Sequence, residues 1–469
     1  MPHKLFEIDE ILRDIVRHTR HTGEATTVSL ACCCKSFEEP ALSLLWACKP
    51  LNQLTALFPS SLTRAPTEEE WNRFRQYASW IRDLSVDLTP AYVTQESSLL
   101  LDLIVSHSPN GPTQQATFPN LRGITWDGEP SSLTYLPSIV SPILTDLRVY
   151  ITTGRETEHL PGEYAPLELV INSTISPSTL QSLCLDIPPE AKPSQELKQA
   201  VADLVLQCGS ALTNFKAEFD IPESAILHLM SLPNLAVWRA AQPAPMKLVS
   251  SPLRQAVSFT QIASLSLHTT TPLNWLSFIG ALAGEKSDPL PVPRAPVFTF
   301  SNLTNFDMDV PSGQACLYSC TFPLTDSDIS LLAATLPRLE WVHLGVPCFF
   351  NTCQTTFRSL HTLSTRCPRL QDLYIHINTA TLVRDIGSVF EEETKGTRPG
   401  SCLGRRSCPL NLWCAHCIPI DANMGVADLE VVVKGFFAVS VTIDLLVAFS
   451  DPNSGLWAKI SSGIKALHV

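Results

Sequence analysis

A short apolar motif with the spacing L-x-x-L-x-L recurs along most of the chain and constrains its fold more than any other feature. Its first, fourth and sixth positions are apolar. The alternation of apolar and polar residues over positions four to six is typical of a half-buried β-strand. The first, fourth and sixth positions are therefore predicted to face the core. The motif occurs at Ile81/Leu84/Val86, Leu121/Ile124/Trp126, Leu144/Leu147/Val149, Leu180/Leu183/Leu185, Leu212/Phe215/Ala217, Leu235/Trp238, Ile262/Leu265/Leu267, Leu303/Phe306/Met308, Leu339/Val342/Leu344 and Leu370/Leu373/Ile375.

A proline turn precedes several of these strands. An apolar residue or Cys, then Pro, a polar residue and Leu stand in this order at 118–121, 232–235, 336–339 and 367–370. Proline ends a helix and biases the residue before it toward extended backbone. The apolar runs upstream predict helices at Ala225–Leu232, Asp328–Leu336 and Thr356–Cys367. The repeating unit is therefore helix, proline turn, short strand and loop.

One such unit cannot bury its apolar face alone, so neighbouring units must stack. Successive motifs lie between about twenty and about forty residues apart, which is wider and less regular than a strict leucine-rich repeat. The pattern predicts an α/β solenoid, an irregular leucine-rich-repeat-like array of short parallel strands and helices. The alternative, a doubly wound α/β domain, is disfavoured because the chain has no G-x-G-x-x-G or P-loop motif and only 19 Gly.

The N-terminal segment has helical periodicity instead. One apolar stripe is formed by Ile8, Ile11, Leu12, Ile15 and Val16. Thr26 and Thr27 are N-cap residue types that predict the start of a second helix. Pro40 is predicted in the first turn of a third helix, where its missing N–H costs little. Three short helices cannot bury all of these side chains, so we expect part of this surface to lie against another chain or another part of this one.

This stretch resembles the F-box. Glu10-Ile11-Leu12 matches the start of the family pattern. The later part matches at Leu30, Cys34, Phe37, Pro40, Leu42, Leu45 and Trp46, and Leu54 with Phe58-Pro59 resembles the following segment of the fungal variant. The match departs at Ile8, where the family usually has Pro, and at Glu7, where it has Leu.

The resemblance implies an all-α module that docks on a small Skp-type adaptor and so joins a cullin–RING ubiquitin ligase. The array that follows resembles the leucine-rich repeats of one branch of that family. On this resemblance the adaptor-binding residues are Ile11, Leu12, Ile15, Leu30, Cys34, Phe37, Leu45 and Trp46, some of which must instead hold the module's own core. The alternative is an amphipathic helical cap on the solenoid, since it would show the same periodicity.

Composition limits the classes of partner. With 45% hydrophobic and 17% charged residues, the chain is expected to be folded and rich in core. A formal net charge of −12 argues against a nucleic-acid-binding surface, which needs a basic footprint. The charged start lacks the apolar core of a signal peptide, and the 15 Cys do not form a small secreted framework. We therefore expect reduced thiols in the cytoplasm or nucleus and no membrane partner.

The segment after Arg384 lacks the proline turn and the motif. Cys414 and Cys417 have the spacing of zinc ligands, but the other nearby pair, Cys402 and Cys408, does not, so we expect free thiols and no metal or cofactor. The apolar run Val431–Phe449 contains Lys434 and Asp444, which favours a buried strand and helix over a membrane span. The array is expected to stop or to lose its pattern here, through a real end cap or an altered C-terminal sequence.

No catalytic motif is present, neither G-x-S-x-G nor H-E-x-x-H nor a kinase-like set. His343 and His376 alternate with apolar residues and are predicted on the strand face opposite the core, either lining the concave surface or simply solvated. Asp326 and Asp328 lie at a predicted helix start, where the helix dipole explains them. We predict no catalytic residue and no enzyme; an enzyme would need a deep pocket with converging titratable groups.

The predicted organisation is an F-box-like helical module at 1–60, the solenoid at 61–385 and a loop with a divergent C-terminal segment at 386–469. The predicted function is that of a non-catalytic adaptor, the substrate-recognition subunit of a Skp–cullin–F-box ubiquitin ligase, with an unidentified target protein on the solenoid. The alternative is a leucine-rich-repeat-like interaction scaffold whose F-box-like cap no longer binds the adaptor.

Overall fold

A computed structural model describes 9–19, 23–58, 64, 66–89, 94–107, 117–152, 162–187, 193–241, 257–258, 261–268, 298–300, 302–309, 324–344, 354–375, 384–388, 410–413 and 441–443. The chain divides into two compact units, unit 1 (Met1–Ile221) and unit 2 (Pro222–Val469). Each unit is taken by itself below.

Unit 1 begins with a helical module made of α1 (Asp9–Thr19), α2 (Glu24–Cys33) and α3 (Lys35–Trp46). Its small core consists of Leu12, Val16, Phe37 and Ala41, with Leu30, Ala31 and Leu44 packed against it. The apolar stripe of α1 and the segment around Phe37 therefore meet as their helical spacing predicts.

Two local predictions in this module are wrong. The N-cap of α2 is Gly23, whose φ of 107° favours glycine, whereas Thr27 is buried inside the helix with its hydroxyl 3.0 Å from that of Thr19. Pro40 lies in the interior of α3 rather than in its first turn. The reason is that α3 begins directly after Cys34, whose extended backbone breaks the apolar run between α2 and α3.

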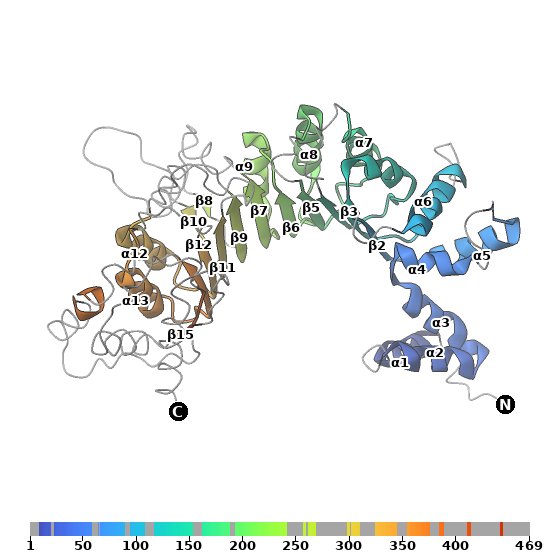
Figure 1. Cartoon of the computed structure of the whole chain (residues 1–469), viewed down its shortest axis with the longest axis horizontal. Coiled ribbons are helices and arrows are strands. Elements are labelled where there is room, and N and C mark those ends of the chain that lie inside the picture. The colour runs from blue at the N-terminus through green and yellow to red at the C-terminus, as the bar shows by residue number, and fades with distance from the viewer. Residues whose placement is uncertain are drawn as a thin grey trace. The chain divides into compact units, whose positions relative to one another are not determined.

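The rest of unit 1 alternates strands and helices. The elements are β1 (Cys48–Pro50), α4 (Leu51–Leu54), the 3-10 helix η3 (Thr55–Leu57), α5 (Glu68–Ala78), β2 (Asp83–Leu88), α6 (Gln95–His107), β3 (Gly123–Gly128), the 3-10 helix η4 (Pro130–Ser138), β4 (Asp146–Ile151), α7 (Ala165–Ser173), β5 (Ser182–Asp186), α8 (Gln195–Gln207) and β6 (Asn214–Ala217). Each described strand pairs in parallel with the next one along the chain. Figure 1 shows α6, α7 and α8 along one side of these strands.

Unit 2 continues the same alternation. The elements are α9 (Glu223–Ser231), β7 (Val237–Ala241), β8 (Val257–Ser258), β9 (Ser264–His268), β10 (Phe298–Thr299), β11 (Asn305–Asp309), α12 (Asp326–Thr335), β12 (Trp341–Leu344), α13 (Phe357–Arg366), β13 (Asp372–Ile375), β14 (Leu410–Trp413) and β15 (Val441–Ile443). The parallel order is β7-β9-β11-β12-β13-β14-β15, and β8 pairs separately with β10.

The ladder of unit 2 extends past the last L-x-x-L-x-L motif, because β14 and β15 still pair in parallel. The sequence pattern is lost there, as predicted, but the strand pairing is not. A strand is observed inside the apolar run 431–449; the helix predicted for that run lies outside the described residues, as do Cys402, Cys408, Cys414 and Cys417.

The repeated motif forms the core of both units. Every motif residue whose side chain is described is buried, and the largest of them are Trp126, Trp238, Phe215 and Phe306. The three helices predicted upstream of proline turns are confirmed as α9, α12 and α13. Capping boxes start α5 at Thr67/Glu70 and α12 at Thr325/Asp328. Short parallel strands that alternate with helices and stack through one apolar face make an α/β solenoid.

Candidate functional site

Some of the predicted adaptor-binding residues lie in the core of the helical module, and the others lie nearer its surface. Leu12 and Phe37 are buried in the module's own core, and Leu30 packs against it. The remaining five lie nearer the surface: Ile11, Leu45 and Trp46 are half-buried, whereas Ile15 and Cys34 are exposed. The hydrophobic side chains available to a partner are therefore fewer than the sequence predicts.

Val28 belongs to the apolar run of the second helix and is exposed, but it was not among the predicted adaptor-binding residues. It is 48% exposed, compared with 37% for Ile15 on α1. The apolar residues of α2 are spread around the helix rather than along one stripe. Periodicity could therefore not assign the outer face of α2.

Trp46 connects the helical module to the first repeat. Its ring lies 4.6 Å from the ring of Tyr77 on α5, and the Lys49 ammonium lies 5.9 Å from its centroid. This packing gives Trp46 a role within the chain itself, since it holds the end of α3 against the following elements.

The side of β2–β6 opposite the motif residues forms a second candidate surface, here called the open face. It consists of the residues that alternate with the buried ones, and the described helices α6–α8 lie along the other side (Figure 1). The register aligns them in three rows: Asp83/Gly123/Asp146/Ser182/Asn214, then Ser85/Thr125/Arg148/Cys184/Lys216, then Asp87/Asp127/Tyr150/Asp186.

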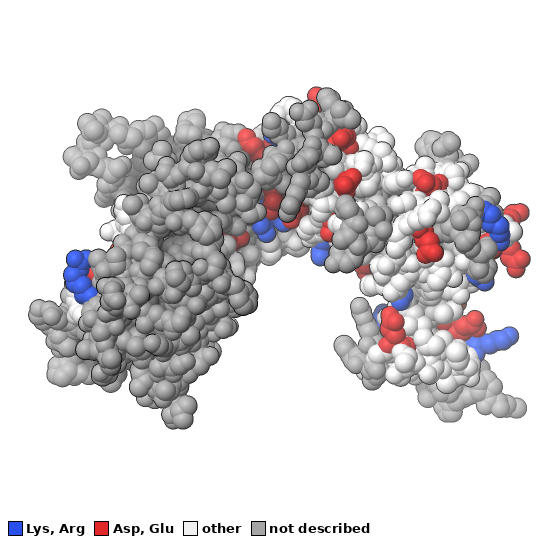
Figure 2. Space-filling view, viewed as in Figure 1, with Lys and Arg blue, Asp and Glu red and all other residues white. Residues whose placement is uncertain are grey.

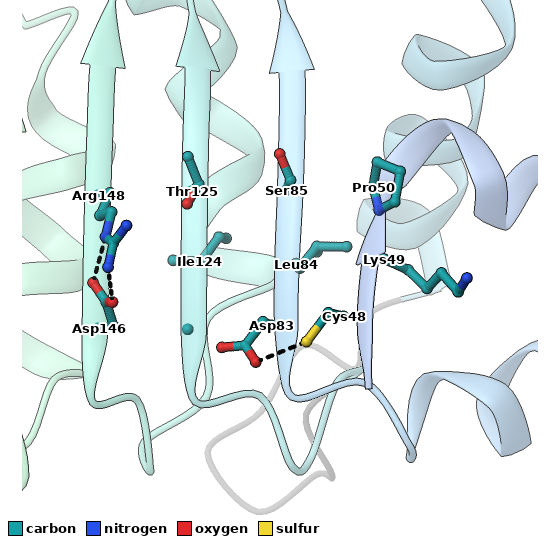
Figure 3. A pocket seen from close by; sticks show the side chains of 11 residues that line it. Cys48, Lys49, Pro50, Asp83, Leu84, Ser85, Ile124, Thr125, Asp146 and Arg148 are labelled. Carbon is teal, nitrogen blue, oxygen red and sulfur yellow. Dashed lines mark hydrogen bonds and ion pairs between the residues drawn. The ribbon is translucent and has the colours of Figure 1, made fainter. Parts of the chain in front are cut away.

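A hollow of about 390 Å³ lies on this face at β1–β4 (Figure 3). Gly123 is part of its lining, and a Cβ at this position would overlap the carboxylate of Asp83. Asp83 accepts a hydrogen bond from the Cys48 thiol at 3.2 Å on one side, and Asp146 holds the Arg148 guanidinium through bonds of 3.1 and 2.6 Å on the other. The hollow is thus open, and its lining carries two carboxylates, Asp83 and Asp146, and two cations, Lys49 and Arg148.

The third row is acidic. Asp127 lies directly across from Asp87 on one side and Tyr150 on the other. Burial raises the pKa of the Asp127 carboxyl, and the charges of Asp87 and Asp186 raise it further. Its Oδ1 is buried and has no hydrogen-bond partner. Burial and the neighbouring carboxylates therefore both disfavour the charged form of Asp127.

Beside this row, the charge of the Lys216 ammonium is compensated by ion pairs with Asp186 and with Glu218, the latter at 3.3 Å. Burial also raises the pKa of the Tyr150 phenol to about 12 and the pKa of the Cys184 thiol. Both groups stay protonated at neutral pH, which makes Cys184 a poor nucleophile.

Unit 2 has its own polar cluster, on the open side of β9–β13. Asp307 accepts a hydrogen bond from the Ser266 hydroxyl at 2.7 Å and pairs with Nδ1 of His343 at 2.7 Å. Trp341 and Tyr374 rings lie 5.9 and 5.3 Å from the His343 ring. His343 is half-buried on the face opposite the core, as predicted, whereas His376 lies outside the described residues.

The order of this cluster does not match a nucleophilic triad. In a triad the imidazole stands between the hydroxyl and the carboxylate and takes the hydroxyl proton. Here the carboxylate of Asp307 lies in the middle, so the Ser266 hydroxyl donates its hydrogen bond to the carboxylate rather than to the imidazole. The cluster is an arrangement for binding or for strand cohesion.

Within the described ranges, no group of three or more His, Cys, Asp or Glu is placed to hold a metal ion. Among the same residues, no helix has both the length and the apolar character needed to cross a bilayer.

The fold and its open strand faces define a repeat protein of the α/β solenoid class. No protein-family model matches the chain, and no curated protein matches it. A solved structure that aligns with it is described as "Crystal structure of Rad7 and Elc1 complex in yeast". The alignment has 13% sequence identity and covers 80% of this chain and 89% of the other, with a TM-score of 0.25. A TM-score this low supports no conclusion about function.

Proposed function

We propose that the protein is a non-catalytic adaptor, the substrate-recognition subunit of a Skp–cullin–F-box ubiquitin ligase. The helical module binds a Skp-type adaptor, and the open strand faces bind a target protein. The protein does no chemistry itself. It brings a target close to the ligase, which raises the effective concentration of the reacting groups.

The observation that carries this proposal is the unequal burial of apolar residues in the helical module. Its core is only four side chains, Leu12, Val16, Phe37 and Ala41, yet Ile15 and Val28 stand 37% and 48% exposed on neighbouring helices. Apolar side chains exposed on a small module that also resembles the F-box are what a helical partner interface needs.

The test is calorimetric titration of the full-length protein with a purified Skp-type adaptor. We expect binding by the wild type and at least about tenfold weaker binding by the double variant Ile15→Asp, Val28→Asp, because two exposed apolar contacts become charged. The matched control is Leu169→Asp on α7, which changes a residue that is 54% exposed outside the module and should bind normally. Circular dichroism must show the same helix content in all three proteins.

Leu12→Asp is unsuitable for this test, because Leu12 is part of the module's core and its loss would unfold the helices. If the wild type fails to bind, the adaptor function is refuted and the module is a cap on an interaction scaffold. If Leu169→Asp loses binding as strongly as the double variant, the contact is not made by α1 and α2.

A further inference from the structure

Two turns of unit 1 lie side by side where its strands β2 and β3 begin. The Arg82 carbonyl accepts a hydrogen bond from the backbone N–H of Arg122 at 2.6 Å. The side-chain amide of Asn120 donates a second hydrogen bond, of 2.7 Å, to the Ser79 carbonyl. The turn that follows α5 is therefore tied to the turn before β3. We call this surface the strand-start edge; it comprises residues 77–82 and 120–122.

Arg82 and Arg122 give the strand-start edge its charge. Both occupy the second position of the L-x-x-L-x-L motif, and the residues that follow them, Asp83 and Gly123, are paired in register. Equivalent positions on adjacent parallel strands project to the same side, about 4.8 Å apart along the backbone. Both arginines are exposed. Their two guanidinium groups therefore belong to one accessible surface.

This positive charge has no counterion within the chain. Among the described residues, neither Arg82 nor Arg122 takes part in an ion pair or a side-chain hydrogen bond. The carboxylate next in sequence, Asp83, is turned toward Gly123 and accepts the Cys48 thiol instead. Figure 2 shows acidic side chains at several places on the visible side of unit 1. Like charges on neighbouring strands repel, so an anionic partner is what this pair of arginines lacks.

Two aromatic residues, Tyr77 and Trp80, lie directly before Arg82. Their rings meet edge to face with centroids 5.2 Å apart, and the Tyr77 ring also packs against Trp46. The Lys49 ammonium lies over Trp46, not over these two rings. Tyr77 and Trp80 are half-buried, and among the described residues neither the phenol nor the indole N–H has a hydrogen-bond partner. Aromatic side chains that keep a polar group at the surface are typical of interfaces.

The combination of residue types indicates the kind of partner. Trp, Tyr and Arg are the residues that most often dominate the binding energy of protein interfaces, and all three occur on the strand-start edge. The guanidinium fork matches the geometry of a carboxylate. A single-stranded nucleic acid also combines anionic groups with stacking, but the net charge of −12 disfavours it. Charge complementarity therefore favours an acidic polypeptide.

We propose that the strand-start edge binds an acidic, extended segment of a partner protein. Carboxylates of that segment pair with Arg82 and Arg122, and an apolar side chain between them packs on Trp80 and Tyr77. The inference goes beyond the adaptor function and does not depend on it, because none of these residues belongs to the exposed apolar surface of α1 and α2.

The test uses a fluorescein-labelled peptide in which Glu alternates with Ser around one central Phe, and two counterparts with every Glu replaced by Gln or by Lys. Fluorescence anisotropy with the full-length protein at physiological ionic strength should detect binding of the Glu peptide. The Gln counterpart should bind about tenfold more weakly and the Lys counterpart not at all, because hydrogen-bonded charge pairs are lost. Equal binding of the Glu and Gln peptides would overturn the proposal.

Variants locate the binding. Arg82→Gln and Arg122→Gln should each weaken binding of the Glu peptide about tenfold, and Trp80→Ala should weaken it as well. Arg17→Gln is the matched control, since it makes the same change on α1 at a side chain that is 70% exposed, and should leave binding unchanged. The double variant Arg82→Glu, Arg122→Glu should bind the Lys counterpart better than the Glu peptide. Circular dichroism must show the same helix content in all variants; wild-type affinity in both Arg→Gln variants would refute the assignment.

Two further measurements separate this proposal from its rivals. If a labelled single-stranded oligonucleotide binds more tightly than the Glu peptide and Arg122→Gln abolishes that binding, the occupant is a nucleic acid and the proposal is overturned. The adaptor titration is repeated with the double variant Arg82→Gln, Arg122→Gln, which should match the wild type; weaker binding would place these arginines in the adaptor interface and also overturn it. Failure of the wild type in that titration would refute the adaptor function alone and leave the peptide result standing.

Discussion

Asp127→Asn should make the protein more stable. In the wild type, the Asp127 carboxylate faces Asp87 across neighbouring strands. Two unit charges about 6 Å apart repel by about 0.7 kcal/mol in water-like surroundings and about 2.8 kcal/mol at an effective dielectric constant of about 20. Because Asp87 is exposed and screened by solvent, we expect a gain nearer the lower figure, about 1 kcal/mol in the free energy of unfolding.

The direction in which the stability gain of Asp127→Asn changes with pH can also be checked. The pKa of Asp127 is raised in the folded protein above its ordinary value, so the unfolded chain loses this proton first as pH rises. Unfolding then releases a proton, and stability falls as pH rises through the window between the ordinary and the raised pKa. The gain from Asp127→Asn should be full above the raised pKa and should vanish as pH falls below the ordinary value.

The assay is thermal unfolding at several pH values, followed by circular dichroism. A gain of about 1 kcal/mol raises the unfolding midpoint of a unit of this size by about 3 °C at neutral pH. Asp203→Asn on α8 serves as the control, since it removes the same charge from an exposed helix surface. The reasoning is refuted if Asp127→Asn unfolds at or below the wild-type temperature at neutral pH, or if its gain persists unchanged in acid.

Three further changes test the fold. Phe215→Ala removes a fully buried strand side chain and should lower the free energy of unfolding, measured in urea, by about 3–5 kcal/mol. The control Ile143→Ala, at a side chain that is 43% exposed, should change this free energy by less than about 0.5 kcal/mol. Thr67→Ala removes the capping box of α5 and should cost about 1 kcal/mol, which thermal unfolding can resolve against a Thr67→Ser control that keeps the hydroxyl. Gly128→Ala places a Cβ 2.9 Å from the Ser132 hydroxyl and 3.1 Å from the Leu88 Cβ. This overpacking should lower the free energy of unfolding by about 1–3 kcal/mol, and with it the unfolding midpoint. Wild-type stability in Gly128→Ala would show that this contact relaxes freely.

Helix boundaries in the N-terminal module were predicted less well than the repeats. The sequence placed Pro40 in a first turn and Thr26 or Thr27 at a cap. Both placements were wrong, because α2 starts at Glu24, after the N-cap Gly23, and α3 starts at Lys35. Cap residues and proline positions depend on where neighbouring helices force the chain to turn. That information is not contained in local spacing.

The spacing of the L-x-x-L-x-L motif by itself determined the repeats and their core. Leu147, Phe215 and Val342 are buried where their motif position predicts, because the alternation of a strand is a property of adjacent residues and needs no distant contact. The same local rule put His343 on the opposite face. Tertiary structure alone decided what the open face presents. Asp87 and Asp127 lie forty residues apart in the chain, and only the register of stacked strands makes them neighbours and leaves the Asp127 carboxylate without a donor.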